Sequence, residues 1–376
     1  MKFFLIAGEA SGDLHASRLI EAIKRYDGEA EFKFLGGDKM MAAAGVAPII
    51  HYRDMAYMGF VDVAKHLPTI LGFMSTAKKE INAWNPDHVI LVDYPSFNLK
   101  IAKYAHKKQI KTHYFISPKV WVWKEWRVKS IKRYVDRMYC ILPFEVDFYR
   151  KHDYEVTYVG NPTVGEINAA IEQMKPREEF IRFNGLDENK PIIALVPGSR
   201  LSEINSNLPI MIEAAKRHPD YQAVIAAAPS VDPNTYYNIL DSTGNTALLV
   251  ENQTWDLIRH SRAAIVTSGT ATLEAAMLNT PQVACFRLNG SKWLYKFYRM
   301  LLKGDYVTLP NLIANEPVIP ELLLHNCTAD AIDKHLTALL ADSPERTKML
   351  EGYDRMSKRL GTGDCCENTA SLLTSH

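Results

Sequence analysis

Residue types suited to sugar and phosphate chemistry recur in short loops of this 376-residue sequence, each directly after an apolar run. The first loop, 8–13 (Gly-Glu-Ala-Ser-Gly-Asp), combines glycines that let a ligand approach the backbone with a carboxylate suited to sugar hydroxyls. It has neither the Gly-Lys-Ser/Thr of a P-loop nor the GxGxxG dinucleotide pattern. The simpler alternative is a tight turn in which Asp13 caps the following helix. The candidate ligand contacts here are Gly8, Glu9, Ser11 and Gly12.

A second acidic motif, 93–98 (Asp-Tyr-Pro-Ser-Phe-Asn), follows the apolar run 88–92. A carboxylate at the carboxyl end of a buried strand faces the ligand side of a parallel sheet. Asp93 could there take a proton from a hydroxyl nucleophile, with Asn98 as a substrate contact. The alternative is an aspartate that serves only as a turn or helix cap.

Two loops in the second half of the chain have the character of phosphate sites. Residues 197–200 (Pro-Gly-Ser-Arg) join backbone donors, a hydroxyl and a fixed positive charge at a helix start. Residues 268–274 (Ser-Gly-Thr-Ala-Thr-Leu-Glu) would let a helix N-terminus reach a diphosphate, with the glutamate on a ribose. Together they predict a nucleotide-diphosphate site formed by Gly198, Ser199, Arg200, Glu203, Ser268, Gly269, Thr270, Thr272 and Glu274.

The elements that must position these loops are short, wholly apolar strands, which are typical of a parallel sheet covered on both faces by helices. The runs 3–7 and 192–196 each open a strand, a Gly/Ser turn and a helix. Two such openings predict an α/β fold with two doubly wound domains and a ligand cleft at the carboxyl ends of the strands. The other expected strands are 32–35, 88–92, 112–116, 138–142, 156–159, 223–227, 246–250, 263–266 and 282–286.

The domain boundary is expected in the polar, helical stretch 166–184, which has no strand signal. This gives a first domain at 1–165 and a second at 186–343. The tail, 344–376, is expected to pack back on the first domain or on a second copy of the chain in a homodimer.

Composition narrows the class of protein. The chain is 47% hydrophobic and 23% charged, with a net charge of +1, so no overall field favours nucleic acid. Its five cysteines show no CxxC pair, and its histidines show no HExxH spacing, which argues against disulfides and zinc. The longest uncharged stretch in the apolar region after His66, 67–77, is about half a membrane span. We therefore expect a cytoplasmic protein that meets a membrane only at its surface.

Three segments are candidates for that membrane contact. At helical spacing, 292–303 places four bases on one face and large apolar residues on the other, the pattern of an interfacial helix. The stretch 58–74 is rich in large apolar residues, and 119–127 places three tryptophans among bases. Each segment also has a structural alternative. The stretch 292–303 could be an ordinary surface helix, and 58–74 could be part of the core. The stretch 119–127 could be an aromatic cluster with snorkelling bases rather than a site for a lipid phosphate.

Taken together, nine motifs in order resemble the lipid-A-disaccharide synthase family, a group of two-domain glycosyltransferases of the GT-B type. The resemblance covers nearly the whole chain and rests on 8–13, 58–61, 93–98, 117–121, 142–145, 159–162, 197–200, 268–274 and 309–311. It implies transfer from UDP-2,3-diacylglucosamine to 2,3-diacylglucosamine 1-phosphate with inversion, releasing UDP and forming the β-1,6 disaccharide of lipid A. It implies no metal and no cofactor, and a peripheral position on the cytoplasmic face of the inner membrane.

The resemblance also bears on individual residues. The family often carries aspartate at the position of Ser96, where it has been the favoured general base, so the base here is open between Asp93 and Glu9. Asn311, in the last motif, is expected to line the cleft. Two other functions share this layout: a UDP-sugar 2-epimerase, which needs no acceptor, and a non-catalytic nucleotide-sugar sensor.

Overall fold

The computed structural model describes residues 1–55, 67–122, 124–244, 247–287 and 306–375. The chain divides into two compact units, described separately below. The first unit comprises Met1–Gly165 together with Thr362–His376, and the second comprises Glu166–Gly361.

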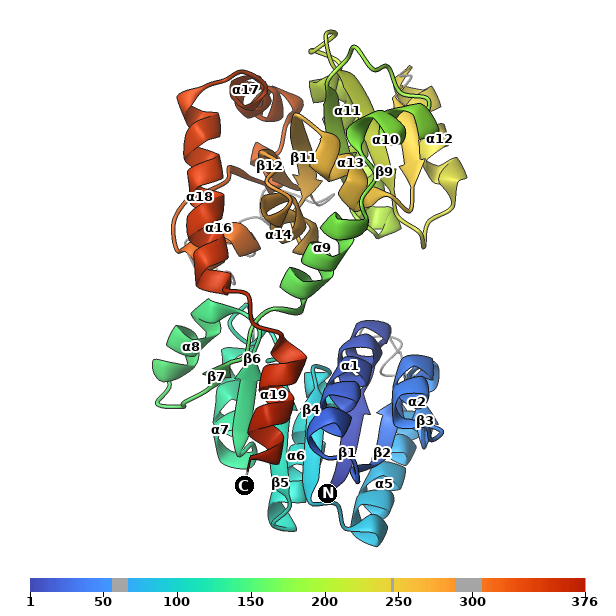
Figure 1. The fold of residues 1–376 in the computed structure, drawn as a ribbon, viewed down its shortest axis with the longest axis vertical. Coiled ribbons are helices and arrows are strands. Elements are labelled where there is room, and N and C mark those ends of the chain that lie inside the picture. The colour runs from blue at the N-terminus through green and yellow to red at the C-terminus, as the bar shows by residue number, and fades with distance from the viewer. Residues whose placement is uncertain (56–66, 123, 245–246, 288–305, 376) are drawn as a thin grey trace. The chain divides into compact units, whose positions relative to one another are not determined.

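The first unit is built on a parallel sheet whose strand order is β3-β2-β1-β4-β5-β6-β7 (Figure 1). Its strands are β1 (Lys2–Ala7), β2 (Glu31–Gly36), β3 (Ile50–His51), β4 (His88–Val92), β5 (Lys111–Phe115), β6 (Arg137–Cys140) and β7 (Thr157–Tyr158). Its helices are α1 (Ala10–Tyr26), α2 (Asp38–Ala44), α3 (Tyr52–Met55), α5 (Leu67–Trp84), α6 (Pro95–Lys107), η1 (Glu125–Arg127), α7 (Val128–Tyr134), α8 (Pro143–Arg150) and α19 (Cys365–Thr374).

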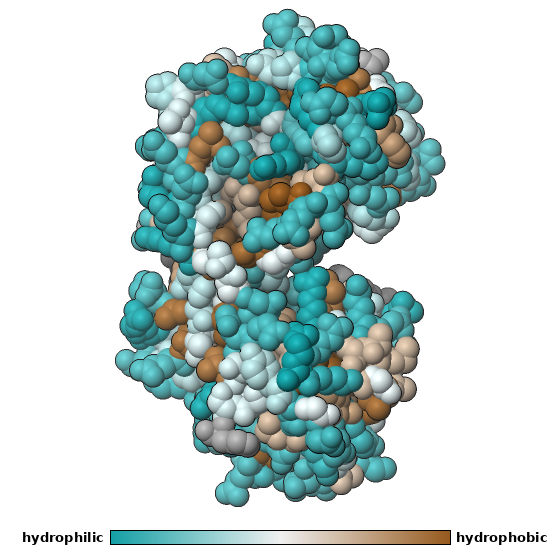
Figure 2. Space-filling view, in the orientation of Figure 1, coloured by the Kyte–Doolittle hydropathy of each residue, from teal (hydrophilic) through white to brown (hydrophobic). Residues whose placement is uncertain are grey.

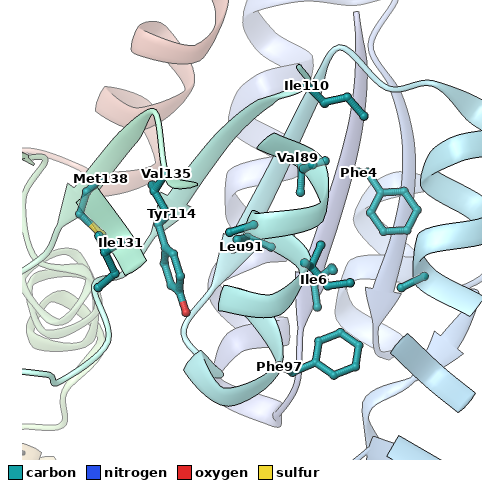
Figure 3. Close-up of a cluster of buried hydrophobic side chains, with 14 of the residues drawn as sticks. Phe4, Ile6, Val89, Leu91, Phe97, Ile110, Tyr114, Ile131, Val135 and Met138 are labelled. Atoms are coloured by element: carbon teal, nitrogen blue, oxygen red, sulfur yellow. The ribbon is translucent and has the colours of Figure 1, made fainter. Parts of the chain in front are cut away.

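The wholly apolar strands of this sheet supply two cores, one on each face. Along β1, Phe4 and Ile6 belong to one buried cluster, whereas Phe3 and Leu5 belong to the other. Successive side chains of a strand point to opposite faces, so a strand covered on both sides must be apolar throughout. Figure 3 shows the first of these clusters, in which the ring of Tyr114 on β5 lies beside Leu91 of β4.

The second unit repeats the plan with the strand order β10-β9-β8-β11-β12-β13. Its strands are β8 (Ile192–Val196), β9 (Gln222–Ala227), β10 (Leu248–Glu251), β11 (Ala263–Thr267), β12 (Gln282–Phe286) and β13 (Glu321–Leu323). Its helices are α10 (Arg177–Phe183), α11 (Leu201–Ala215), α12 (Pro233–Thr243), α13 (Thr254–His260), α14 (Thr270–Met277), α16 (Leu309–Ala314), η2 (Leu324–Asn326), α17 (Ala329–Leu340) and α18 (Pro344–Leu360). Helix α9 (Pro162–Gln173) contains the division between the units.

The tail does not behave as the single segment expected for 344–376, because its two helices belong to different units. Helix α18 buries Met349, Tyr353 and Met356 at helical spacing, and Tyr353 is hydrogen-bonded to Gln282 of β12. Helix α19 packs on α1 of the first unit. The turn between them contains Gly361, whose φ of +64° ends α18.

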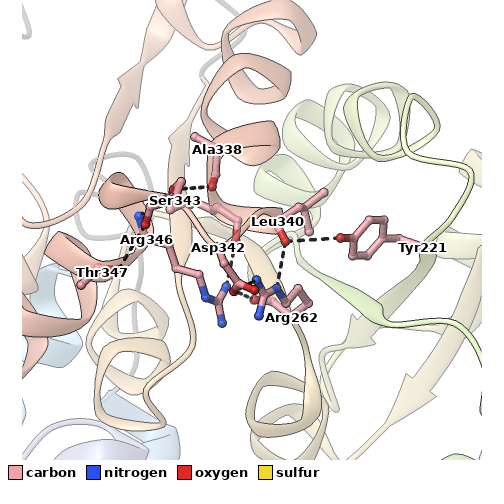
Figure 4. Close-up of polar contacts among 9 residues, drawn as sticks. Tyr221, Arg262, Ala338, Leu340, Asp342, Ser343, Arg346 and Thr347 are labelled. Carbon is pink, nitrogen blue, oxygen red and sulfur yellow. Dashed lines mark hydrogen bonds and ion pairs between the residues drawn. The ribbon is translucent and has the colours of Figure 1, made fainter.

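A polar cluster joins the end of α17 to the second sheet (Figure 4). The carbonyl of Leu340 accepts hydrogen bonds from Arg262 Nε at 2.9 Å and from the Tyr221 hydroxyl at 3.3 Å. Arg262 also pairs with Asp342, and Ser343 caps α18 by accepting from the amide of Arg346. The corner between α17 and α18 is thus satisfied by side chains from elsewhere in the unit.

The faces of the two units seen in Figure 2 are mostly hydrophilic, with apolar residues in small groups. In the described part of the chain, no helix combines the length and the apolarity that crossing a bilayer requires.

Candidate functional site

In the first unit, the loops with candidate chemistry meet at one point of the sheet. The chain runs outward from β1 through β2 to β3 on one side, and from β4 through β5 on the other. Such a reversal opens a crevice between the two central strands at their carboxyl ends, here called the carboxyl edge. Ala7 pairs with Val92, so Glu9 and Asp93 leave adjacent strands almost side by side.

Asp93 lies in a turn whose backbone conformation is uncommon for residues other than glycine. Asp93 and Tyr94 both have positive φ, +42° and +46°. Two buried side chains hold the carbonyl of Asp93: Asn98 Nδ2 donates to it at 2.8 Å, and the hydroxyl of Tyr114 donates as well. In Figure 3 that hydroxyl points toward the carboxyl ends of the strands. The main chain of the turn is therefore fixed without use of the Asp93 carboxylate.

Gly8 makes room for this turn. A Cβ on Gly8 would lie 2.4 Å from Cγ of the Tyr94 ring, which essentially no side chain could tolerate. The hydroxyl of Tyr94 in turn donates to the carbonyl of Met55. The glycine expected to admit a ligand instead admits an aromatic ring of the protein.

The surroundings of Asp93 suit a general base. Burial, and after it the negative charge of the neighbouring Glu9, raise the pKa of Asp93 from 3.8 to about 6, although Lys119 partly opposes the shift. Proton transfer is most effective when the pKa of the base lies near the working pH. Glu9 is exposed, and its carboxylate accepts a hydrogen bond from Ser11 Oγ at 2.7 Å.

The remaining predicted residues of this loop have structural places. Gly12 is buried, and a Cβ there would lie 3.3 Å from Cβ of Ala7. Asp13 does not cap its own helix α1; its carboxylate accepts from the amides of Gly37 and Met40 at the start of α2. Asn98 is fully buried and supports the Asp93 turn rather than lining an open surface.

The buried support of this edge comes from the motifs 117–121 and 142–145, which count toward the family resemblance but received no role from the sequence. Burial raises the pKa of the Glu145 carboxyl to about 8, and this carboxyl also accepts from the amide of Leu142 at 3.2 Å. Ser117 Oγ is hydrogen-bonded to the hydroxyl of Tyr149 at 2.9 Å. These contacts anchor the segment after β5 that carries Lys119. The sequence signal for this support was the presence of polar residues directly after an expected strand.

The second unit repeats the reversal between β8 and β11, where both predicted phosphate loops begin. Gly198 has a φ of +108°, and a Cβ there would lie 2.5 Å from Oε2 of Glu203. That carboxylate accepts from the amide of Ser199 at 3.2 Å and pairs with Arg200 at 3.4 Å. Glu203 thus covers amide donors at the start of α11, while the Arg200 side chain is 75% exposed.

In the loop after β11, Gly269 and Thr270 are exposed at the start of α14, which leaves the helix N-terminus open to an anion. Ser268 is half-buried, and its amide donates to the carbonyl of Cys285. Thr272 is fully buried and its hydroxyl donates to the carbonyl of Gly269 at 2.7 Å, so it shapes the turn from within.

Glu274 is held from behind by an aromatic residue that the sequence did not identify. One of its carboxylate oxygens accepts from Trp255 Nε1 of α13 at 2.8 Å. Burial raises the pKa of Glu274 above its ordinary value, and the Trp255 hydrogen bond partly opposes this. The second oxygen has no hydrogen-bond partner among the described residues and is the atom that could meet a ribose hydroxyl.

Asn311 does not line an open surface as expected. It is 1% exposed, and its amide is used on both sides. Nδ2 donates to the carbonyl of Ile319 and to Glu321, while Oδ1 accepts from the amides of Val318 and Ile319. The motif 309–311, on which that expectation depended, cannot distinguish this internal role from a ligand contact. The motif 58–61, Trp123 and the basic segment 292–303 lie outside the described residues.

Comparison with known proteins gives consistent results. A family model described as Lipid-A-disaccharide synthetase matches residues 3–373. The lipid-A-disaccharide synthase of Myxococcus xanthus is 37% identical over 377 residues, covering 99% of this chain and 97% of that protein. The lipid-A-disaccharide synthase of Geobacter metallireducens is 35% identical over 376 residues, covering 99% and 96%.

Solved structures resemble the chain over its whole length at low sequence identity. The UDP-GlcNAc 2-epimerase of Neisseria meningitidis, bound to UDP-GlcNAc, has a TM-score of 0.65 at 14% identity and 99% coverage of both chains. The calicheamicin glycosyltransferase CalG4 has a TM-score of 0.59 at 13% identity, covering 99% of this chain and 96% of that one. These likenesses confirm the predicted fold, two parallel-sheet α/β domains of the GT-B type.

Proposed function

The chain belongs to the lipid-A-disaccharide synthase family, and on that premise we propose how its two carboxyl edges divide the reaction. The enzyme transfers the sugar of UDP-2,3-diacylglucosamine to 2,3-diacylglucosamine 1-phosphate. The products are UDP and the β-1,6-linked disaccharide 1-phosphate of lipid A.

At the first edge, Asp93 is the general base of this proposal. It takes the proton of the acceptor hydroxyl as that oxygen attacks the anomeric carbon from the face opposite UDP, which inverts that carbon. The observation that carries the assignment is the position of Asp93 beside Glu9, where the strand order reverses. The surroundings there raise the pKa of Asp93 to about 6. Glu9 and Ser11, both exposed beside it, hold hydroxyls of the acceptor sugar.

At the second edge, the donor's nucleotide binds. The starts of α11 and α14, with the exposed Arg200, stabilise the negative charge that develops on the leaving diphosphate. A diphosphate bound at α11 would accept a hydrogen bond from the Ser199 amide. The Glu203 carboxylate, which accepts from that amide in the structure, must therefore move away when the diphosphate binds. Glu274 takes the ribose with the oxygen that Trp255 leaves unused.

We further propose that the enzyme works at the cytoplasmic surface of the inner membrane, where substrates with fatty chains reside. The sequence of 292–303 supports this, since a basic amphipathic helix binds anionic lipid surfaces. Replacing Lys292, Lys296, Arg299 and Lys303 by Gln should abolish salt-sensitive cosedimentation with anionic vesicles. Unchanged cosedimentation would contradict the proposal.

Association with a second copy of the chain remains a prediction, which sedimentation velocity would test.

The direct test of the function is disaccharide formation from the acylated donor and acceptor in neutral detergent micelles, with UDP release followed in parallel. Release should need both substrates, and should fall at least about tenfold in the Arg200→Gln variant through loss of charge-assisted contacts to the diphosphate. Lys216→Gln, an exposed base at the far end of α11, is the matched control.

The same assay separates the alternative functions. An epimerase would convert UDP-N-acetylglucosamine without any acceptor, and a sensor would bind the nucleotide sugar without releasing UDP. Either result, combined with no disaccharide from the acylated pair, would overturn the assignment.

A further inference from the structure

An arginine lies against the same turn as the proposed base. Arg127 ends η1 and immediately precedes α7, which packs against α6. Its Nη2 donates to Ser96 Oγ at 2.9 Å. Ser96 is exposed in the first turn of α6, three residues after Asp93. A fixed positive charge is therefore bonded to the start of α6, which directly follows the turn that holds Asp93.

No carboxylate of the described residues neutralises Arg127. Its recorded side-chain contacts are the Ser96 hydroxyl and the ring of Trp126, whose centroid lies 5.7 Å from the guanidinium carbon. The side chain is half-buried, and that burial lowers its pKa. Lys124, also half-buried, adds a second positive charge close enough that Arg127 contributes to lowering the pKa of Lys124, after burial. Two cations held together in this way would be stabilised by an anion.

We propose that Arg127, Ser96 and Lys124 form a phosphomonoester subsite that holds the 1-phosphate of the acceptor sugar. This rests on the proposed function, which requires an acceptor carrying that phosphate. In a pyranose, C1 and C5 flank the ring oxygen, so the phosphate on C1 and the hydroxyl on C6 lie at the same edge of the ring. An acceptor whose 6-hydroxyl meets Asp93 therefore needs an anion site near Asp93. The Arg127 guanidinium, bonded to Ser96 at the start of α6, is placed to supply that site.

The subsite also has an apolar side, in keeping with an amphiphilic ligand. Trp126 is 65% exposed and stacks against the Arg127 guanidinium. An exposed ring beside a fixed cation can contact the sugar face or an acyl chain while the cation pairs with phosphate. The phosphate of an anionic membrane lipid has the same chemistry, so a test must separate the two sources.

The test compares Arg127→Gln with the parent in neutral detergent micelles, which contain no anionic lipid. Steady-state kinetics use 2,3-diacylglucosamine 1-phosphate and, separately, the acceptor without its phosphate. Arg127→Gln should lower kcat/KM for the phosphorylated acceptor roughly 10- to 100-fold, mainly through KM, by removing a charge-assisted contact. It should leave kcat/KM for the unphosphorylated acceptor and the KM of the donor unchanged, and Arg127→Lys should recover part of the loss.

Inhibition by glucosamine 1-phosphate, which has no acyl chains, provides a second readout that is independent of turnover of the unphosphorylated acceptor. This inhibition should weaken in Arg127→Gln relative to that by glucosamine.

Lys129→Gln, an exposed base on α7, is the control and should match the parent. Equal losses with both acceptors, or no loss with the phosphorylated one, would overturn the subsite. An effect that appears only with anionic vesicles would assign Arg127 to membrane lipid instead. A parent enzyme that forms no disaccharide would refute the proposed function, a separate outcome.

Discussion

At the scale of the residue, Asp93 combines a strained backbone with an environment that disfavours its charge. Positive φ at two consecutive non-glycine residues costs free energy, which the surrounding hydrogen bonds from Asn98 and Tyr114 offset. Such strain is retained where it holds a side chain in a required position. Here it turns a carboxylate toward the carboxyl edge beside Glu9.

The pH dependence of turnover can decide which acid is the base. With a pKa of about 6, an Asp93 base predicts a kcat/KM that rises with pH through about 6 and then levels. Glu9→Gln removes a negative neighbour that raises this pKa, so the rising limb should move to lower pH by up to about one unit.

Glu9→Asp retains the charge and should leave the limb near its original position. A fall of about 100-fold or more for Glu9→Gln at every pH would identify Glu9 as the base.

The sequence was enough to predict Glu9, Asp93, Arg200 and Glu274 as residues at the carboxyl edges, because each belongs to a loop or helix start that follows an apolar strand. It was not enough to separate ligand contacts from internal support. Asn98, Thr272 and Asn311 are as polar as any ligand contact, yet the structure buries them against main-chain groups. Trp255 and Tyr114 were missed because their partners are distant in sequence.

At the scale of the element, three neighbouring strands are joined by a buried row of polar rings. His88 of β4 and His113 of β5 share a hydrogen bond of 3.0 Å, and His113 is bonded to the Tyr139 hydroxyl of β6 at 3.2 Å. Burial lowers the pKa of both histidines, that of His113 to about 3. Both imidazoles are therefore neutral in the folded protein at neutral pH.

This row predicts acid destabilisation. Below about pH 6.5 the unfolded chain takes up protons that the folded protein excludes, so the free energy of unfolding falls as the pH falls. Between about pH 6.5 and pH 5, His113 alone should account for about 2 kcal/mol. In His113→Phe, urea unfolding should show a weaker dependence on pH over this range. A pH dependence equal to that of the parent would exclude His113 as a source.

The turn that leads into α19 packs closely against a glycine of the first unit. Gly160 has a φ of +104°, and a Cβ there would lie 2.3 Å from the carbonyl oxygen of Gly363. Gly160→Ala should destabilise the protein by at least about 1–3 kcal/mol and loosen α19. Trypsin cleavage after Lys358 or Arg359, in the last turn of α18, should then be faster than in the parent.

Gly28→Ala is the matched control, because a Cβ at Gly28 has nothing within 4 Å. If both variants were cleaved at the parent rate, the packing of α19 would not depend on the turn at Gly160.

The expected strands show what periodicity can and cannot supply. Runs such as 88–92, 192–196 and 282–286 coincide with β4, β8 and β12, because buried parallel strands are apolar throughout. The short strands β3 and β13 were not expected, since two or three residues contain no usable pattern. The tail was expected as one segment because its sequence contains no information on which unit each helix would meet.

At the scale of the whole molecule, the chain builds the same device twice. Each unit places its chemistry where the strand order reverses, acids in the first and helix starts with Arg200 in the second. In this account one unit supplies the base for the acceptor and the other stabilises the leaving nucleotide. Because donor and acceptor react with each other, both edges serve one reaction, and removal of either should stop it.

The account can be tested most directly by turnover of Asp93→Asn with the acylated donor and acceptor. The raised pKa of Asp93 means that its ionised form costs folding stability above about pH 6, so the variant should be at least as stable as the parent there. UDP affinity should be unchanged, because Asp93 belongs to the first unit. We predict a loss of disaccharide formation of about 100-fold or more. Turnover within about threefold of the parent, with UDP affinity intact, would contradict the assignment of Asp93 as the base.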